Sequence, residues 1–433
     1  MNFPHPETAV PPRTFRLLTI ALLLLLPSPL RAGENWPGFR GPTGQGITDE
    51  KNLPRTWGGK SAENVLWKVP LPGAEPGNKL DNNQSSPIVW KDRVFVSMVY
   101  WPKDVDKAEY PEHRVACFAV ADGKKLWDVG VKPGPWKLKD FRGGYSAPTP
   151  TTDGERIYAL FGSSVIAALD FDGKEVWRKE ILPVAWDVAI GTSPVLFKGT
   201  VLVLADGTKP DKSRLIAFDA KTGDVAWEKS RPKSNFSHST PLLIEVAKKA
   251  QLVIASSNQL QGVDPSDGRI VWWANAKGDV PTPAFAGGIV YSEDGRGGPG
   301  IGVDPTGEGD LTTKLKWKTT PIPEGYSSPT IAGESIYRMH NPGILKCLKL
   351  STGEVVYTER LPGGVDQSAS PILTPENEIL FVSGGKSIVV PVGPKFEVKQ
   401  TNDLGDGSSA SAAVAGGKLF IKGAKFLHCI GAK

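Results

Sequence analysis

Short runs of alternating hydrophobic and polar residues fill the chain, and one compact unit of them recurs. It is clearest at residues 217–227, AFDAKTGDVAW, where one alternating run meets a polar turn with Gly223 and a second run ends on Trp227. Two such runs around a glycine turn are typical of a β-hairpin. Related segments end at Trp127, Trp177, Trp272, Trp317 and Tyr357. Six copies of one hairpin predict a repeat architecture.

A second mark, polar residues followed by proline, accompanies each hairpin. Its copies are Ser85–Pro87, Ser146–Pro148, Thr192–Pro194, Ser239–Pro241, Thr282–Pro283, Ser327–Pro329, Ser370–Pro371 and a degenerate eighth around Ala412. Proline is tolerated at the first residue of a strand, where its missing N–H breaks no ladder bond. Because another strand pair lies between each mark and its hairpin, every unit is predicted to be a four-stranded antiparallel meander, with strands A to D.

The last unit ends at Lys433 after its third strand, and an unpaired strand with Trp67 precedes the first unit. Pairing this strand, within residues 63–73, with the last unit would remove two open sheet edges. We therefore predict an all-β fold: an eight-bladed β-propeller over residues 63–433, closed by its N-terminal strand. Residues 33–62 are rich in Gly and Pro and show no period, so we expect an extended arm.

The repeat aromatics are expected to pack from strand D between neighbouring blades, because large flat side chains fill the space that sheet twist opens. This docking set is Trp67, Trp127, Trp177, Trp227, Trp272, Trp317 and Tyr357. On this interpretation, Trp227→Ala would cost about 3–5 kcal/mol. Cys117, Cys347 and Cys429 occupy the first position of the repeat, where other copies have Ala or Gly. We interpret that position as one for a small side chain and the cysteines as free thiols, with a disulfide as the alternative.

Composition agrees with many short strands, since Gly 48 and Pro 38 stand against only 3 Met. The N-terminus has Arg13 and Arg16, an apolar run over residues 17–26, and a small residue at Ala32. A run of this length is typical of a signal peptide, so we expect residues 1–32 to be removed and the protein to be exported, periplasmic or extracellular and soluble. The remaining chain would carry 48 basic against 45 acidic residues, a balance that does not favour nucleic acid.

In a meander, the B to C and D to A connections lie on one face, and in this chain they are the long and varied ones. Function concentrates in such loops. Residues expected around the channel mouth on that face are Gln84, Arg142, Tyr145, Trp186, Asp187, His238, Asp279, Arg296, Tyr326, His340 and Gln367. Convergent polar and aromatic groups suggest a ligand site. The alternative is a channel lined by polar residues that hold only water.

No motif for a catalytic site stands out in the sequence. There is no HExxH, no haem attachment motif, no nucleophile elbow and no P-loop. The glycine-rich loop after Glu293 precedes no helix and is interpreted as a plain B to C turn. No catalytic residue and no metal ligand is therefore assigned.

The full pattern at residues 217–227 resembles the tryptophan-docking motif of the pyrroloquinoline quinone (PQQ) repeat propellers, and the arm sequence WPGFRGP resembles that of secreted PQQ-like propeller proteins. The resemblance implies the propeller fold over the mature chain. Its family contains alcohol and glucose dehydrogenases that bind PQQ with calcium in the channel. It also contains a cofactor-free scaffold lipoprotein of the outer-membrane β-barrel assembly machine.

This chain lacks the adjacent cysteine pair of those dehydrogenases and the lipid-attachment cysteine of the scaffold protein, and their calcium ligands do not map onto it. We therefore expect an exported, non-catalytic binding or scaffold propeller, a monomer without a cofactor or a membrane span. Its partner on the long-loop face would be a protein, a glycan or a small ligand. The alternative is a PQQ-dependent dehydrogenase acting on alcohols or sugars.

We predict that the mature protein begins close to Gly33. Mass spectrometry of the N-terminal peptide of the exported protein measures this directly. An intact N-terminus recovered from a membrane fraction would contradict the prediction.

Overall fold

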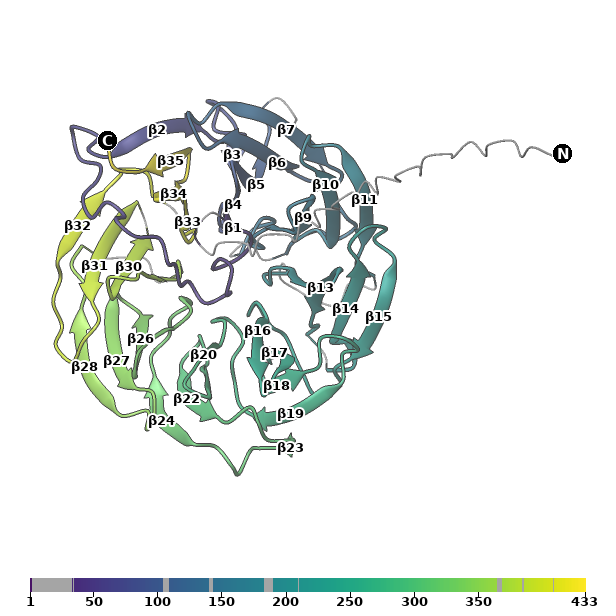
Figure 1. Ribbon diagram of the computed structural model, residues 1–433, viewed down its shortest axis with the longest axis vertical. Helices are drawn as coiled ribbons and strands as arrows, with labels where there is room; N and C mark the ends of the chain where they lie inside the picture. Colours follow the sequence, from purple (N-terminus) through teal and green to yellow (C-terminus); the bar gives the residue numbers. More distant parts are fainter. Residues whose placement is uncertain are drawn as a thin grey trace. The chain divides into compact units, whose positions relative to one another are not determined.

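The computed structural model describes residue 1 and residues 33, 35–103, 109–139, 143–182, 190–208, 210–363, 368–383, 385–407 and 409–433. From residue 33 onwards, the described chain forms eight four-stranded antiparallel sheets that follow one another around a ring (Figure 1). The predicted eight-bladed β-propeller is confirmed. The expected signal peptide lies outside the described residues. Within those residues, no helix is long and apolar enough to cross a membrane.

The first four blades use these strands in the order A to D. Blade 1 has β4 (Ile88–Trp90), β5 (Arg93–Trp101), β6 (Glu112–Ala119) and β7 (Lys125–Val131), and blade 2 has β8 (Thr151–Thr152), β9 (Arg156–Phe161), β10 (Val165–Asp170) and β11 (Glu175–Glu180). Blade 3 has β12 (Val195–Phe197), β13 (Thr200–Ala205), β14 (Arg214–Asp219) and β15 (Val225–Ser230), and blade 4 has β16 (Leu242–Val246), β17 (Lys249–Ala255), β18 (Gln259–Val263) and β19 (Ile270–Asn275).

The other four blades repeat this plan. Blade 5 has β20 (Ala284–Ala286), β21 (Ile289–Ser292), β22 (Gly298–Val303) and β24 (Trp317–Ile322), and blade 6 has β25 (Thr330–Ala332), β26 (Ser335–His340), β27 (Ile344–Lys349) and β28 (Val355–Arg360). Blade 7 has β29 (Ile372–Leu373), β30 (Glu378–Ser383), β31 (Lys386–Pro391) and β32 (Gln400–Asp403), and blade 8 has β33 (Ala413–Ala415), β34 (Lys418–Lys422), β35 (Phe426–Ile430) and β2 (Val65–Pro70).

Three short strands add to blade edges, and one helical turn lies in a loop. β1 (Asn35–Trp36) and β3 (Lys79–Leu80) pair in blade 1, and β23 (Gly309–Asp310) pairs with β19 of blade 4. The helical turn is the 3₁₀ segment η1 (Pro210–Lys212). β23 belongs to the longer C to D turn of blade 5, so that turn covers the outer edge of the neighbouring sheet.

β2 closes the ring, as the unpaired N-terminal strand predicted. It pairs antiparallel with β35, and Trp67 lies opposite Cys429. Blade 8 therefore takes its outer strand from the start of the propeller and its three inner strands from the end. No blade edge is left open at the junction of the two chain ends, and β2 and β35 lie side by side in Figure 1.

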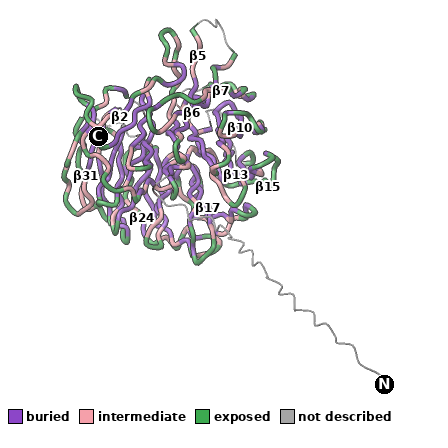
Figure 2. The backbone as a smooth tube through the Cα atoms, turned by 45° about the horizontal axis from the view of Figure 1, so that its top comes forward, coloured by how far each residue is buried: buried purple, intermediate pink, exposed green. Residues whose placement is uncertain are grey.

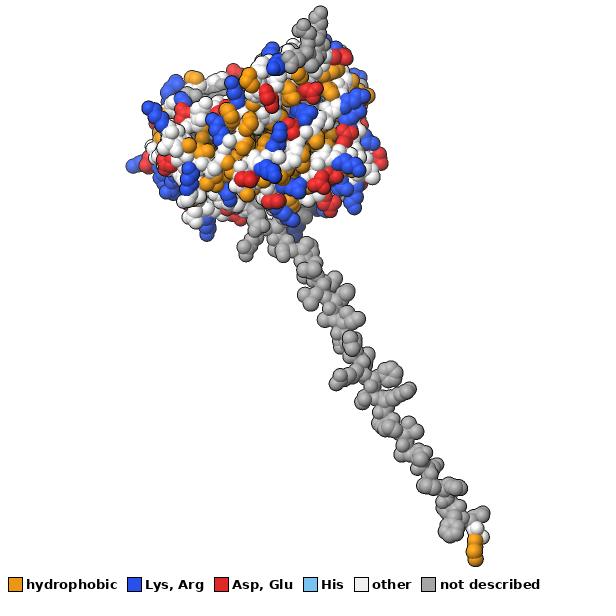
Figure 3. Space-filling view, turned by 90° about the horizontal axis from the view of Figure 1, so that it is seen from above, with side chains coloured by type: hydrophobic (Ala, Val, Ile, Leu, Met, Phe, Trp, Pro, Cys, Tyr) orange, Lys and Arg blue, Asp and Glu red, His pale blue; other side chains and the backbone are white. Residues whose placement is uncertain are grey.

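The hydrophobic core is divided among the gaps between adjacent blades. One cluster joins blades 1 and 2, the next joins blades 2 and 3, and similar clusters continue around the ring. Figure 2 shows the buried strand interiors with exposed turns at their ends. On the side seen in Figure 3, cationic and anionic side chains are interspersed over the described surface.

The strand D tryptophans latch each blade to the next one. Four of them donate the indole N–H to a backbone carbonyl in the C to D turn of the following blade, over 2.8–3.0 Å: Trp67 to Val120, Trp127 to Phe171, Trp177 to Ala220 and Trp317 to Leu350. The glycine of that turn lies under the ring. At Gly223, with a φ of 72°, an added Cβ would come 2.6 Å from the indole of Trp177. The turn glycine is thus required by both its conformation and the indole above it.

The residue opposite each docking aromatic is small for a related reason. The three cysteines lie on strand C, each directly opposite a docking aromatic on strand D: Cys117 faces Trp127, Cys347 faces Tyr357 and Cys429 faces Trp67. Other blades have Ala or Gly in this place. At Gly302, an added Cβ would come 2.4 Å from Trp317. All three cysteines are free and buried, which confirms that the position accommodates a small side chain.

Three docking positions differ from this scheme. Tyr357 has no indole and packs on Phe396 of blade 7. Trp272 is fully buried and donates to the side chain of Gln251, which in turn donates to the carbonyl of Pro305 in the next blade. Gln251 thereby relays the latch bond. Trp227 is only partly buried, although it still packs on Gly268 of the next blade. The cost expected from the sequence for Trp227→Ala is therefore too high for this position, and Trp177 is the better test.

We predict that Trp177→Ala lowers the free energy of unfolding by about 3–5 kcal/mol, because it empties a buried site and removes one of the two donors to the Ala220 carbonyl, the other being the Tyr158 hydroxyl. Trp227→Ala is the matched control and should cost clearly less, because its ring already meets solvent. Urea unfolding of both variants measures the difference. Equal losses would contradict the latch as the source of the stability.

Candidate functional site

The inner strands are joined by a ring of hydrogen bonds around the central channel. At seven of the eight junctions between blades, a backbone N–H at the start of strand A donates to a Ser or Thr hydroxyl of the next blade. The bonds, 2.8–3.1 Å long, run from Ser86 to Thr149, Thr149 to Ser193, Ser193 to Thr240, Thr282 to Ser328, Ser328 to Ser370, Ser370 to Ser411 and Ser411 to Ser86. We call the eight Ser and Thr residues named here the hydroxyl ring.

Proline explains why the ring forms at these positions. All ring residues except Ser411 directly precede a proline, and the residue before proline is confined to extended conformations. Strand A is the innermost strand, so its first residue has no neighbouring strand to accept a buried N–H. In blade 1, β1 does pair with β4, but only at Val89 and Trp90. A hydroxyl on the next blade supplies the acceptor. The ring therefore solves a hydrogen-bonding problem that the propeller creates at its own centre.

In blade 2, the sequence-based assignment of this mark was wrong by two residues. The ring member is Thr149, before Pro150, and not the segment Ser146–Pro148. The Ser146 hydroxyl instead lies 3.2 Å from those of Ser85 and Ser97. Pro148 and Pro150 both fit the pattern in the sequence, and only the register of strand A shows which of them follows the ring residue.

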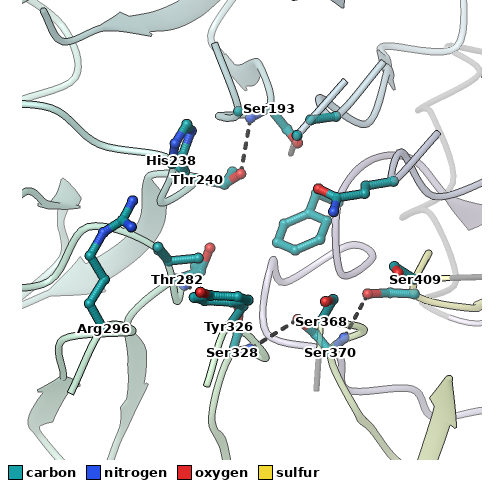
Figure 4. Close-up of a pocket in the computed structure, with 17 residues that line it drawn as sticks. Ser193, His238, Thr240, Thr282, Arg296, Tyr326, Ser328, Ser368, Ser370 and Ser409 are labelled. Carbon is teal, nitrogen blue, oxygen red and sulfur yellow. Dashed lines mark hydrogen bonds between the residues drawn. The ribbon is translucent and has the colours of Figure 1, made fainter. Parts of the chain in front are cut away.

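The ring surrounds a central pocket of about 210 Å³ (Figure 4). Six of the eight ring residues, all except Ser86 and Thr149, line it together with Ser368, Ser409, Gln84, His238, Arg296 and Tyr326. Phe39, from the N-terminal arm, also contributes to its wall. The other pocket residues lie on the inner strands or on the long-loop face, whereas Phe39 reaches the pocket from the opposite side.

The arm closes the channel on the face of the A to B turns. The Pro37 carbonyl accepts from Thr152 in blade 2, Gln45 accepts from Phe285 in blade 5, and Gly46 accepts from Leu373 in blade 7. These bonds, 2.7–2.8 Å long, tie one segment to blades across the ring. Phe39 lies within this segment, and the pocket is therefore blind on the arm side.

Arg40 anchors the arm beside the pocket and is fully enclosed. One terminal nitrogen donates to the Pro329 carbonyl at 2.8 Å and to the Thr330 hydroxyl at 3.1 Å. Among the described residues, no carboxylate lies within ion-pair distance of it, and burial lowers the pKa of Arg40 to about 9. A buried cation without a counter-charge makes the interior next to the pocket favourable for negative charge or for acceptor oxygens.

The chemistry of the pocket is that of hydrogen-bond donors. Each ring hydroxyl that accepts a backbone N–H keeps its own proton to donate. Among the described lining residues, Arg296 is the charged one and none is a carboxylate. The pocket thus suits a ligand rich in acceptor oxygens, and the apolar ring of Phe39 would contact its less polar part.

Arg296 is held in place by a network on the loops of blades 4 to 6. Its Nε donates to Asp279 at 2.7 Å, and its guanidinium lies 5.6 Å from the centre of the Phe236 ring. The loop that carries Arg296 is fixed by Glu293, which pairs with Arg338 and accepts from the Tyr291 hydroxyl at 2.9 Å. Glu293 and Arg338 are both fully buried.

The structure brings four of the predicted mouth residues together: Gln84, His238, Arg296 and Tyr326 all line the central pocket. Asp279 lies behind Arg296, and the other described candidates are elsewhere. Tyr145 is buried and accepts from the Leu138 N–H at 3.0 Å, while buried His340 contacts the Asn341 carbonyl at 3.1 Å. The remaining candidates, Arg142, Trp186, Asp187 and Gln367, lie outside the described residues.

Phe39 and the hydroxyl ring were missed as site residues. The sequence did show a signal for each, since Phe39 is an aromatic residue in an extended arm and the ring residues, Ser411 excepted, stand before the repeat prolines. The sequence did not show where on the propeller the arm binds.

PQQ with calcium does not fit the described lining of the central pocket. Calcium takes six to eight oxygen ligands, with carboxylates prominent among them. The described pocket residues offer no carboxylate. The nearby Asp279 carboxylate is engaged by Arg296. Among the described residues, no group of three or more His, Cys, Asp or Glu side chains is arranged to hold a metal ion. We derive no reaction step through the quinone.

The sequence matches the family model described as outer membrane protein assembly factor BamB over residues 111–359, more than half of the chain. Against proteins of curated function, it finds no match.

Solved structures show the same fold at low sequence identity. A europium-containing methanol dehydrogenase is 12% identical, with 89% of each chain covered and a TM-score of 0.67. BamB from Moraxella catarrhalis is 12% identical, with 85% of this chain and 97% of that chain covered and a TM-score of 0.56. The computationally designed Ika8 protein is also 12% identical, with 82% and 98% covered and a TM-score of 0.54. A dehydrogenase, BamB and a designed protein share this fold, which therefore does not decide function.

We predict that Ser370→Ala lowers the free energy of unfolding by about 1–3 kcal/mol, because the buried Ser328 N–H loses its acceptor. Ser370→Thr should restore most of the loss, since threonine already serves at other ring positions. Thermal and urea unfolding measure both variants. Equal destabilisation by alanine and threonine would show that packing, and not the hydroxyl, matters at this position.

Proposed function

The chain belongs to the outer membrane protein assembly factor BamB family of PQQ-repeat β-propellers, and on that premise we propose that it is an exported, non-catalytic binding propeller. Its ligand would enter from the long-loop face and place a group rich in acceptor oxygens in the central pocket. The observation that carries this proposal is the blind pocket itself, with a hydroxyl ring for its walls and Phe39 near its base.

The described pocket supports binding better than catalysis. Its hydroxyls accept backbone N–H groups from the neighbouring blade, so each of them keeps a proton to donate to a ligand. The described lining residues include no carboxylate that could serve as a general base.

Fixed donors favour binding, because little conformational freedom is lost when a ligand arrives. The ring residues are locked by proline on one side and by the next blade on the other. A carboxylate or a set of carbonyl oxygens, from a partner chain or a small molecule, would replace the water that such hydroxyls otherwise bind. The partner supplies the rest of the contact on the long loops.

We predict that tri-alanine with a free carboxylate binds the purified protein about tenfold more tightly than tri-alanine amide, because the amide presents one acceptor oxygen fewer and no charge. Isothermal titration calorimetry compares the two peptides. Equal heats from both would contradict the acceptor chemistry of the pocket.

The dehydrogenase alternative is tested in the same preparation. PQQ with Ca²⁺ should give neither micromolar uptake in calorimetry nor dye-linked alcohol oxidation. Uptake with turnover would overturn the non-catalytic proposal, whatever the peptides do.

A further inference from the structure

A second pocket, of about 550 Å³, lies beside the central one on the same face. Loops of blades 3, 4 and 5 line it, with Asn235, Phe236, Asn258, Lys277, Asp279 and Asp294 among them. Its size is in the range of small-molecule sites in proteins. Arg296 separates it from the central pocket and contributes to both.

Phe236, in the wall of this pocket, has a backbone conformation that is unfavourable for its residue type. Its φ is 30°, in the region that bulky side chains avoid because the backbone is strained there. Three hydrogen bonds fix it: its N–H donates to Gly207 at 2.8 Å, and its carbonyl accepts from the N–H of Ser257 at 3.2 Å and from its hydroxyl at 2.9 Å. The ring meets His238 edge to face at 4.6 Å. The loop thus maintains an aromatic surface at the pocket.

Two buried oxygen atoms of this pocket accept no hydrogen bond. They are Oδ1 of Asp279 and Oδ1 of Asn235. Asp279 as a residue is only 4% exposed, and its other oxygen holds Arg296. Leaving a buried acceptor unsatisfied carries a free-energy cost. A ligand that brings hydrogen-bond donors would recover this cost.

The charges of the pocket balance. Asp279 and Asp294 stand against Lys277 and Arg296. Burial raises the pKa of Asp294, and the Asp279 carboxylate adds to this rise, against the N–H of Arg296 that donates to Asp294 at 3.0 Å. A hydroxyl placed between the two carboxylates would relieve their repulsion without adding charge. The balance favours a neutral ligand over an anion or a metal ion.

We propose that this pocket binds a neutral saccharide. The C–H groups of one sugar ring would pack on the part of Phe236 that lines the pocket, because an aromatic ring attracts weakly positive hydrogens. Its hydroxyls would donate to Asp279 and Asn235 and accept from Lys277 and Arg296. The site is distinct from the central pocket, so it stands whether or not that pocket takes an acceptor-rich group.

The test is calorimetry of the whole exported protein with three neutral tetrasaccharides, cellotetraose, maltotetraose and N,N′,N″,N‴-tetraacetylchitotetraose, with tetragalacturonate and Ca²⁺ as charged probes. At least one neutral sugar should bind at millimolar concentration or below. Asn235→Leu should weaken it at least about tenfold without lowering stability, because the lost oxygen bonds nothing in the free protein. Phe236→Leu should weaken it by a similar factor.

Gln400→Leu, an amide replaced on the outer strand of blade 7 outside both pockets, is the matched control and should bind as the parent does. The proposal is overturned if none of the three neutral sugars binds, if tetragalacturonate or Ca²⁺ binds about tenfold more tightly than all of them, or if Asn235→Leu and Phe236→Leu both bind like the control. Thermal unfolding of each variant separates loss of binding from loss of fold. Failure here leaves the peptide and quinone measurements untouched.

Discussion

A backbone N–H that has no strand beside it governs the centre of this propeller. The innermost strand of each blade faces the channel, and its first amide would be buried without a partner. Proline after that residue fixes its extended conformation, and a hydroxyl from the next blade accepts its proton. The same bond aligns neighbouring blades and decides what the channel presents to a ligand. The hydroxyls that satisfy the buried N–H groups are therefore the same groups that a ligand in the channel would meet.

The tryptophan latch performs a similar task at the outer radius. There, an indole N–H meets a carbonyl in the next C to D turn, and glycine makes room beneath it. Hydrophobic clusters fill the space between the two sets of bonds. At Trp272 the bond to the next blade is made indirectly, because Gln251 accepts from the indole N–H and donates to the Pro305 carbonyl.

The fold could be predicted from the sequence because its determinants are local and repeated. A turn glycine, an aromatic four residues later and a proline at each inner strand recur often enough to count blades, and the missing strand of the last blade identified β2 as its closure. The site was harder, because it depends on contacts far apart in the chain. Gln84, His238 and Tyr326 were placed at the mouth by their position before strand A, and Arg296 by its place on a B to C loop. Tyr145 and His340 were placed there for the same two reasons, yet they turn into the interior. Nothing local showed that Phe39 enters the channel or that Thr149, and not Ser146, completes the ring.

The pairing of β2 with β35 also has a consequence for how the molecule is made. Synthesis produces β2 before every blade and β35 after almost all of them, so the edge of β2 has no partner until the chain is nearly finished. Blades 1 to 7 can pack in order as they emerge, but the ring stays an open arc with two exposed edges, which are the parts of a nascent sheet most prone to wrong pairing. Closure brings together residues from opposite ends of the sequence, a step with a high entropic cost that comes late. A chain stopped before Ile430 would thus lose more than one strand: it would remain an arc, and its hydroxyl ring would have no circle to complete.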